Sequence, residues 1–402
     1  MLSLEEAQQR ILDLPFSLPT QTQQLSNCFG CYLAEDILAK TPLPHWNNSA
    51  MDGYAFSWND LENGQFQYSI SMIIAAGDTS KNILPSGTAA RIMTGAPLPQ
   101  GANTVIMQEN TETIDPNTIR FLEKPSKGKG ANVRLAGEEI SVGEIALQKG
   151  TRLGAAELGL CVSLGYSALK VFSPPKIGII ATGDELKTAG EELQFGEIWS
   201  SNTISIQIAL RELGFLAKDY GIARDNLQST KKVFGKAFEE CDIIISTGGV
   251  SVGDFDVVKE ALNDFKLEMS FWKVRMKPGK PIAYGTMNGK RLFALPGNPV
   301  SCLMSFYQFL RPFLLKSVSC SRIFLPNIQV KLAEAITPRG SRLDFRRMVL
   351  EERNGELYAK ETGSQSSAWL SSFVQADALF PIQPNAAPFP KDSLITVQLL
   401  PK

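Results

Sequence analysis

The chain has 402 residues, too many for one ordinary domain, and its 44% hydrophobic content is sufficient for several packed cores. Its 40 basic and 41 acidic residues balance, so no net charge attracts nucleic acid or a membrane surface. The longest apolar stretches are shorter than half a bilayer span and no signal peptide opens the chain, so we expect no membrane segment and a cytoplasmic location.

Residue usage also limits the chemistry. The single histidine, His45, excludes Ser-His-Asp and Cys-His mechanisms unless it is itself the base. The six cysteines are spread too thinly for a disulfide framework, and the lone Cys28-Phe-Gly-Cys31 motif has no second pair for zinc. Any chemistry must therefore depend on carboxylates, Lys, Arg, Ser, Thr and a metal ion.

The beginning of the chain predicts helices. Ser3 and Glu6 form a capping box, apolar residues follow at helical spacing, and Pro15 ends the helix. A second helix is expected over about residues 27–37.

Two Pro-rich boundaries divide the first half of the chain. The segment Thr41-Pro-Leu-Pro44 precedes a strand-like stretch rich in Gly, Pro and Asn, and Ser173-Pro-Pro175 follows the return of a helical pattern. We therefore expect a β-rich inserted domain over 43–143. It is flanked by the two parts of an elongated, helical linker domain at 1–42 and 144–175.

The centre of the chain predicts a doubly wound α/β domain over residues 176–326. Three short Ile- or Leu-rich runs are each followed by a Gly-centred turn and a helix-compatible segment, at 176–186, 242–254 and 291–301. Repeated strand, Gly turn and helix are typical of a parallel sheet covered on both faces. Beyond this domain the apolar period shortens to two, so residues 327–402 are expected to form a small, barrel-like antiparallel β domain.

The Gly turns predict an anion site with a metal ion beside it. Ligands of doubly wound sheets bind at the carboxyl ends of the strands, and backbone N–H groups in Gly loops and at helix N-termini favour phosphates. Carboxylates beside a phosphate site suggest a hard cation such as Mg²⁺ between them. The loops carry four such residues, Asp184, Glu185, Asp254 and Asp256.

A cluster of cations lies between two of these loops. The Pro278-Gly279 turn can bring Lys277 and Lys280 together, which favours anion binding over a merely solvated face. Neither a Walker A sequence nor a G-x-G-x-x-G fingerprint occurs, which argues against a nicotinamide oxidoreductase.

Seven short motifs occur in order along the chain, at residues 48–55, 91–97, 182–186, 201–203, 246–254, 277–281 and 295–301. Together they resemble the molybdopterin molybdenumtransferases, the family of bacterial MoeA and the gephyrin E domain. The resemblance extends from near residue 3 to beyond residue 370. Four positions depart from the family pattern, since Leu135-Ala136 replaces residues that are often basic, Glu139 replaces Asp and Ala368 replaces Gly.

The resemblance implies a late step of molybdenum cofactor synthesis. Adenylylated molybdopterin would be bound, molybdate inserted at its dithiolene, and AMP released with the help of Mg²⁺. The family is an elongated four-domain homodimer whose cleft lies between the α/β domain of one subunit and the β-rich domain of the other. Asp52, Thr94, Arg134 and Glu139 would then act on the partner's site.

The motif matches also imply roles for individual residues. Catalytic roles fall to Asp52, Glu185, Asp225, Lys277 and Lys280, and metal binding to Glu185, Asp225 and Asp256. Substrate binding falls to Thr94, Arg134, Glu139, Thr182, Gly183, Ser201, Asn202, Thr247, Gly248, Gly249, Ser251, Pro296, Gly297, Asn298, Pro299 and Ser366.

Two other functions stay open. The chain could be a non-catalytic scaffold or carrier for the cofactor precursor, although a pure binder has no need of clustered unpaired acids. It could also be the molybdopterin adenylyltransferase, which shares the α/β domain, although the additional domains argue against this. Expected partners are the small-molecule substrates, the adenylyltransferase and the molybdoenzyme acceptors, with no nucleic acid or membrane.

Overall fold

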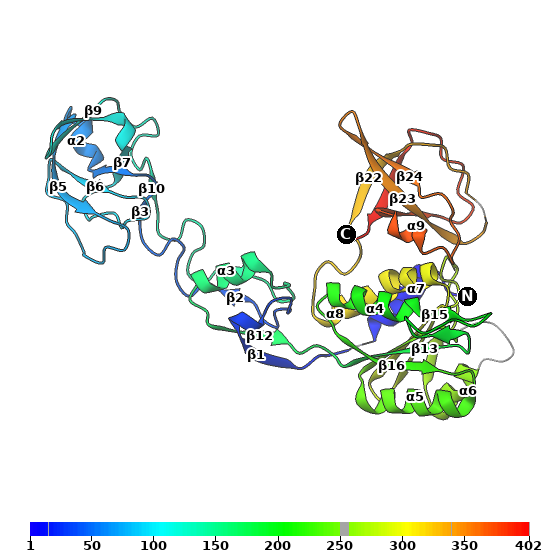
Figure 1. Ribbon diagram of the computed structural model, residues 1–402. Coiled ribbons are helices and arrows are strands. Elements are labelled where there is room, and N and C mark those ends of the chain that lie inside the picture. Colours follow the sequence, from blue (N-terminus) through cyan, green and yellow to red (C-terminus); the bar gives the residue numbers. More distant parts are fainter. Residues whose placement is uncertain (15, 250–256, 339, 402) are drawn as a thin grey trace.

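The computed structural model describes residues 1–14, 16–249, 257–338 and 340–401. The molecule is elongated (Figure 1), with the β-rich inserted domain at one end and a slender linker in the middle. The α/β domain lies at the other end, with the C-terminal domain beside it. No helix in the described parts of the chain is both long and apolar enough to cross a membrane.

The α/β domain is built on a six-stranded sheet in the order β16-β13-β17-β21-β20-β18. The first four strands are parallel, and every residue of β13 and β17 is buried, as expected for strands covered on both faces. The strands are β13 (Ile177–Thr182), β16 (Ala217–Ala223), β17 (Ile243–Thr247), β18 (Glu268–Phe271), β20 (Ala283–Met287) and β21 (Lys290–Leu295).

Side chains of one strand alternate between two cores. Ile179 packs into the core that contains Ile206 and Phe309, whereas its neighbour Ile180 packs into the core that contains Phe234. Period-two alternation thus buries both faces of the sheet. The covering helices are α4 (Ser201–Glu212), α7 (Pro299–Ser305), a π-helical turn (Phe306–Leu310) and α8 (Arg311–Ser317) on one face, and α5 (Leu227–Glu240) and α6 (Val257–Asp264) on the other.

The first helix joins the α/β domain rather than the linker. Helix α1 (Leu4–Asp13) has the expected capping box at Ser3, and its buried face packs into the same core as α8. The Gln8 side-chain amide donates to the Gln308 carbonyl (2.8 Å). The N-terminus is therefore fixed against the domain that carries the Gly loops.

The linker is formed by two distant segments that pair with each other. Strand β1 (Thr20–Gln24) pairs with β12 (Ala168–Phe172), β2 (Ile37–Leu38) pairs with β11 (Ile145–Leu147), and α3 (Ala155–Ser163) packs beside them. The helix expected over residues 27–37 is wrong. A short 3₁₀ turn, Leu25–Asn27, is followed by Gly30 with a φ of +77°, a conformation that interrupts any helix.

The inserted domain is a mixed sheet in the order β7-β4-β6-β5-β9-β8, in which only β5 and β6 run parallel. Two short strands, β3 (Asn48–Ser49) and β10 (Val133–Arg134), connect it to the linker. Its other elements are β4 (Gly53–Phe56), α2 (Trp58–Glu62), β5 (Gln67–Ile74), β6 (Thr88–Ile92), β7 (Thr104–Met107), a 3₁₀ turn (Gln108–Asn110), β8 (Thr111–Asp115) and β9 (Thr118–Phe121).

The C-terminal domain is a closed five-stranded barrel. Strand β23 pairs with both β24 and β25, so the order β23-β24-β22-β26-β25 returns to its start. The two-residue strand β19 (Met276–Lys277) adds to its edge. The expected fold class is confirmed: a doubly wound α/β domain, an inserted β domain, a linker and a small barrel. The barrel elements are β22 (Asn327–Leu332), β23 (Leu343–Arg353), β24 (Glu356–Glu361), α9 (Ser371–Val374), β25 (Ala378–Ile382) and β26 (Leu394–Leu399).

Candidate functional site

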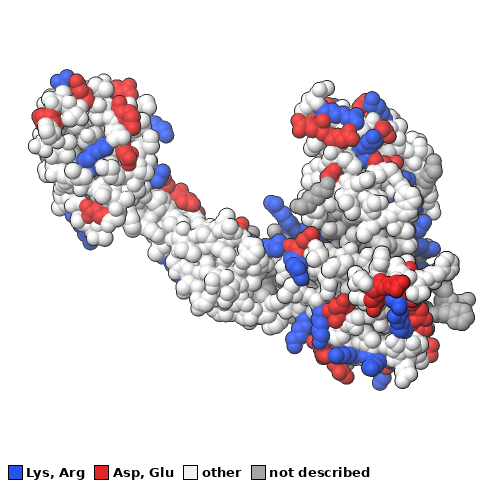
Figure 2. Space-filling model, in the orientation of Figure 1, with Lys and Arg blue, Asp and Glu red and all other residues white. Residues whose placement is uncertain are grey.

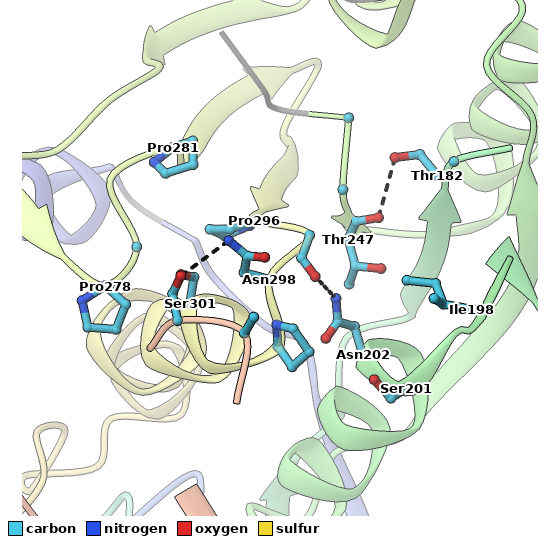
Figure 3. Close-up of a pocket in the computed structure, with 18 of the residues that line it drawn as sticks. Thr182, Ile198, Ser201, Asn202, Thr247, Pro278, Pro281, Pro296, Asn298 and Ser301 are labelled. Carbon is cyan, nitrogen blue, oxygen red and sulfur yellow. Dashed lines mark hydrogen bonds between the residues drawn. The ribbon is translucent and has the colours of Figure 1, made fainter. Parts of the chain in front are cut away.

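A cavity of about 1300 Å³ opens where the parallel strands of the α/β domain end. Its walls are the loops that follow β13, β17 and β21, the turn that contains Lys277 and Lys280, and a loop of the C-terminal barrel (Figure 3). This is the place where doubly wound sheets bind their ligands. The sequence-predicted residues that line it are Thr182, Gly183, Glu185, Ser201, Asn202, Asp225, Thr247, Gly248, Gly249, Lys277, Lys280, Pro296, Gly297, Asn298, Pro299 and Ser366.

The Gly loops bring backbone close to backbone. A Cβ atom added to Gly248 would lie 2.6 Å from the Thr182 carbonyl oxygen, and one added to Gly249 would lie 2.4 Å from a Val258 methyl group. Both glycines have positive φ angles, +87° and +64°. No other residue type fits here without strain, because the space beside each glycine is taken by Thr182 or Val258. The Gly248 N–H donates to the Leu295 carbonyl (3.0 Å), so these glycines let the strand ends pack closely together beside the cavity.

Side-chain hydrogen bonds hold these loops in register. The Thr182 hydroxyl donates to the Thr247 carbonyl (3.3 Å), which joins the ends of β13 and β17. The Asn202 amide donates to the Gly297 carbonyl (2.6 Å), which joins the start of α4 to the loop before α7. These two hydrogen bonds therefore fix the loops that form the floor of the cavity.

The loop after β13, which carries Asp184 and Glu185, is fixed by three hydrogen bonds to its backbone carbonyls. Arg224 Nη1 donates to the carbonyls of Asp184 (2.9 Å) and Leu186 (3.1 Å), and the N–H of Ile198 donates to the carbonyl of Glu185 (2.8 Å). The Glu185 carboxylate lies over Gly183, where an added Cβ would be 2.4 Å from Glu185 Oε2. Sequence analysis did not identify Arg224 as a residue that supports the loop containing Glu185.

The described carboxylates suit Mg²⁺ held partly by the substrate. Glu185 and Asp225 both line the cavity. Among the described residues, no group of three or more metal-binding side chains converges on one point. Mg²⁺ is commonly held by one or two carboxylates together with substrate phosphates, so two carboxylates beside phosphate loops fit this ion. Two other expected residues, Asp256 and Ser251, lie outside the described part of the chain, as does Asp254.

Among the described residues that line the cavity, three are cations: Lys277, Lys280 and Arg342. Lys277 Nζ lies 3.9 Å from the buried Asp344 carboxylate, which also pairs with Arg346 (2.8 Å). In the described parts of the chain, no carboxylate lies within 4.0 Å of the Lys280 or Arg342 side chains. Their charge is therefore available to an anionic ligand.

The barrel contributes a loop that the sequence only partly indicated. The Asn298 amide donates to the Ser367 hydroxyl (3.3 Å), and the N–H of Val300 donates to the Ser367 carbonyl (3.1 Å). Sequence analysis named Ser366 but missed Ser367, Gln365 and Arg342, because the docking of the barrel on α7 is a long-range event without a local signal. Trp199 was also missed, although it lies two residues before the motif at 201–203.

A buried arginine supports this loop. Arg347 is 1% exposed, and its Nη2 donates to the carbonyls of Ser364 (3.3 Å) and Ser366 (3.1 Å). Its Nε donates to the Ser372 hydroxyl (3.2 Å). Burial lowers the pKa of Arg347 to about 10, so the guanidinium is still charged at neutral pH.

Four expected residues lie in or beside the inserted domain, outside the cavity. The N–H and hydroxyl of Thr94 donate to Asp52 Oδ1 (2.7 and 2.8 Å), and these two bonds lower the pKa of Asp52. Arg134 lies in β10 and Glu139 follows it, near the linker. Figure 1 shows this domain at the opposite end of the molecule from the α/β domain. Within one chain these residues do not join the cavity.

Comparisons with known proteins agree along the whole chain. Three family models match in order: "MoeA N-terminal region (domain I and II)" over residues 2–165, "Probable molybdopterin binding domain" over 178–316, and "MoeA C-terminal region (domain IV)" over 329–400.

Curated relatives and solved structures agree with these three family models. A molybdopterin molybdenumtransferase of Haemophilus influenzae is 34% identical over 99% of this chain and 98% of its own length. One of Staphylococcus aureus is 36% identical over 84% of this chain and 80% of its own. The crystal structure of a molybdopterin biosynthesis moeA protein from Pyrococcus horikoshii is 27% identical, with a TM-score of 0.84 over all of both chains.

Proposed function

The chain belongs to the MoeA family of molybdopterin molybdenumtransferases, and from that premise we propose that it inserts molybdate into adenylylated molybdopterin and releases AMP. The resemblance seen in the sequence is confirmed, and the protein is a transferase of molybdenum cofactor biosynthesis. We propose in addition that the substrate is adenylylated, that the metal ion is Mg²⁺ and that the protein acts as a homodimer. The roles of individual residues are likewise proposed.

The observation that carries the proposal is the shared cavity. Gly-rich loops and, among the described residues, two carboxylates and three cations line one space at the carboxyl end of a parallel sheet. The Gly loops suit the phosphates of an adenylylated substrate. Lys280 and Arg342 suit the negative charge of phosphate and of the incoming molybdate. A non-catalytic carrier would not need these carboxylates beside the phosphate loops.

Glu185 and Asp225 would hold Mg²⁺ against the phosphates. The ion supplies charge neutralisation at the phosphoanhydride when it is bound. The fixed carbonyls of residues 184–186 keep the Glu185 backbone in place during the reaction. Lys277 and Lys280 stabilise the charge that develops on the departing AMP, since fixed cations act most strongly where charge grows in the transition state.

A homodimer would complete the site. Asp52, Thr94, Arg134 and Glu139 cannot reach the cavity of their own chain, so their proposed roles require a partner's cavity. The linker supports this assembly. Figure 2 shows few charged side chains over the linker in this view, and Phe29, Ile145 and Val162 are exposed there.

The place of the reaction in synthesis defines the proposed partners. An adenylyltransferase must supply the adenylylated substrate, and molybdoenzyme acceptors must consume the product. We place this exchange in the cytoplasm on the basis of composition, as the sequence suggested.

The test is direct. The full-length protein is incubated with adenylylated molybdopterin, molybdate and Mg²⁺, and AMP is measured by chromatography. AMP release that requires all three components is expected. Tight binding of the adenylylated pterin without AMP release would favour the carrier function instead.

A further inference from the structure

The turn that carries the two cavity lysines is joined to the barrel by backbone pairing. Strand β19 runs parallel to the first residues of β23, and this register places Lys277 directly opposite Asp344. Beside this pair, the N–H of Leu343 donates to the Arg275 carbonyl (3.2 Å). The turn after β19, which ends at Lys280, lines the cavity (Figure 3). One short parallel pairing therefore connects the barrel with this wall of the cavity.

Asp344 is a buried carboxylate at this junction. The residue is 4% exposed, and among the described residues no group donates a hydrogen bond to its Oδ2 atom. Two cations lie near this oxygen: Arg346 Nε at 2.8 Å, without hydrogen-bond geometry, and Lys277 Nζ at 3.9 Å. A buried charge is costly unless charged partners compensate it, so the Lys277 ammonium is part of the environment that this carboxylate needs.

Arg346, the other cation beside Asp344, is held from its far side. Its Nη1 donates to Glu361 Oε1 (2.9 Å), and its side chain is largely buried. Asp344 and Arg346 lie two residues apart in β23, on the same face of the strand. Charges of opposite sign therefore alternate from Glu361 in the barrel to Lys277. Of these four residues, only Lys277 lines the cavity, and its side chain is 43% exposed.

The second lysine of the turn is supported differently. The Lys280 carbonyl accepts from the N–H of Val274 (3.1 Å) and of Ile282 (3.2 Å), so its backbone is fixed. In the described parts of the chain, however, no carboxylate lies within 4.0 Å of the Lys280 ammonium. Ordering a long lysine side chain costs rotamer entropy when a ligand binds. A carboxylate that already orders Lys277 reduces this cost, and Lys280 has no such carboxylate among the described residues.

We propose that Asp344 is a positioning residue, which orders the Lys277 ammonium for an anion in the cavity. The inference rests on the proposed function, because it takes the phosphate and the molybdate of that reaction as the anions. An ammonium group has three donors, so one can face Asp344 while the others face the ligand. The barrel then contributes to anion binding through a residue that does not itself line the cavity.

A double-mutant cycle measures this role. Dissociation constants for AMP and for molybdate are measured by calorimetry on the full-length protein, on Asp344→Asn, on Lys277→Ala and on the double variant. Loss of the Asp344 charge by itself favours an anion, but this gain is common to both backgrounds and cancels in the cycle. Ordering one long side chain corresponds to roughly 2- to 12-fold in affinity. For at least one anion, Asp344→Asn should be less favourable by that factor when Lys277 is present than when it is replaced.

Lys280→Ala gives the matched control, because its cycle with Asp344→Asn should show no coupling. Glu356→Gln is the control for the barrel, since Glu356 pairs with Lys331 at the surface (2.6 Å) and does not line the cavity. It should leave both dissociation constants unchanged. Thermal unfolding verifies that each variant is folded. If Asp344→Asn does not fold, Asp344→Glu keeps the charge but displaces it by one methylene, and its cycle with Lys277→Ala should show a smaller coupling of the same sign.

Four outcomes would overturn the positioning role. They are no binding of either anion by the wild type, no coupling between Asp344 and Lys277, an equal coupling with Lys280, and a coupling of opposite sign. The last would make Asp344 a competitor of the ligand for the ammonium. None of these decides the proposed function, which AMP release by the wild type tests separately. Coupling with Lys277 in a protein that releases no AMP would leave the positioning role standing and remove the proposed reaction.

Discussion

Asp184 and Asp225 cap each other's backbone at the mouth of the cavity. The N–H of Asp225 donates to Asp184 Oδ1 (3.0 Å), and the N–H of Asp184 donates to Asp225 Oδ2 (3.3 Å). The pair joins the loop after β13 to the loop after β16. Asp225 therefore reaches the cavity with one oxygen fixed, which leaves its other oxygen and the Glu185 carboxylate for the proposed metal ion.

This arrangement predicts that a substitution at Glu185 lowers turnover much more than it lowers substrate affinity. Glu185→Gln keeps size and hydrogen bonding but removes the charge that Mg²⁺ requires. Single-turnover AMP release should fall far more than substrate affinity, since the ion acts on the activated phosphoanhydride in the transition state. Glu192→Gln, an exposed change in the following loop, should have no effect. Normal turnover of Glu185→Gln, or full activity after thorough chelation, would remove the metal role.

A second prediction concerns the cations. Lys280→Ala should weaken binding of the adenylylated pterin, because a charge-assisted hydrogen bond is worth ~1.5–3 kcal/mol, or roughly ten- to 150-fold in affinity. Lys273→Ala is the control, since Lys273 is exposed on the same segment but does not line the cavity. Equal dissociation constants for the two variants would show that Lys280 does not contact the ligand.

The sequence was most informative where the signal is local. A buried strand followed by a Gly turn has a recognisable pattern, so Thr182, Gly248 and Asn298 could be predicted together. The helix expected over 27–37 failed because Gly30 takes a left-handed conformation that composition does not reveal. Arg342 and Ser367 depend on the docking of the barrel on α7, and Trp199 depends on the pairing of two short strands, β14 (Leu186–Lys187) and β15 (Ile198–Trp199). Such contacts join residues that are distant in the chain, and one sequence carries no record of them.

A third prediction tests the composite site. Asp52→Ala and Lys280→Ala place their defects at opposite ends of the molecule. If each cleft combines the inserted domain of one subunit with the α/β domain of the other, a mixed dimer holds one intact cleft. Mixing the two impaired variants under conditions of subunit exchange should therefore raise AMP release above that of either variant alone.

The control for this experiment is each variant mixed with itself, which should stay as impaired as before mixing. Exchange is verified with differently tagged subunits. Demonstrated exchange without any recovery would place all functional residues of a site within one chain, contrary to the separation seen in Figure 1.

A fourth prediction follows from the lowered pKa of Asp52. The bonds from the N–H and the hydroxyl of Thr94 both favour the carboxylate form. Because the folded pKa lies below the unfolded value near ~4, the stabilisation is present above that value and is lost as the pH falls through the folded pKa. Thr94→Val removes the hydroxyl only, so the Asp52 pKa should rise towards its ordinary value. Carbon-detected NMR titration of the Asp52 carboxyl would show this, and an identical pKa in both proteins would contradict it.

The last prediction concerns Arg347, which links the stability of the barrel to the shape of the cavity. Its guanidinium is buried and donates to two carbonyls of the loop that carries Ser366. Arg347→Met fills a similar volume but leaves those carbonyls without a donor. The buried Ser372 hydroxyl also loses its donor, Arg347 Nε. A buried acceptor that loses its partner costs ~1–3 kcal/mol, so the midpoint of thermal unfolding should fall clearly.

Because the loop also lines the cavity, the same variant should bind the adenylylated pterin more weakly. Arg347→Lys keeps the charge but not the planar fork, and it should recover only part of the loss. Arg353→Met is the control in the same barrel strand. Arg353 is exposed, lies over the Tyr358 ring and forms an ion pair with Glu351, and such a surface ion pair contributes ~0–1 kcal/mol. If Arg347→Met lowered stability without changing affinity, Arg347 would support the barrel alone, and the loop would keep its position through Asn298 and Val300.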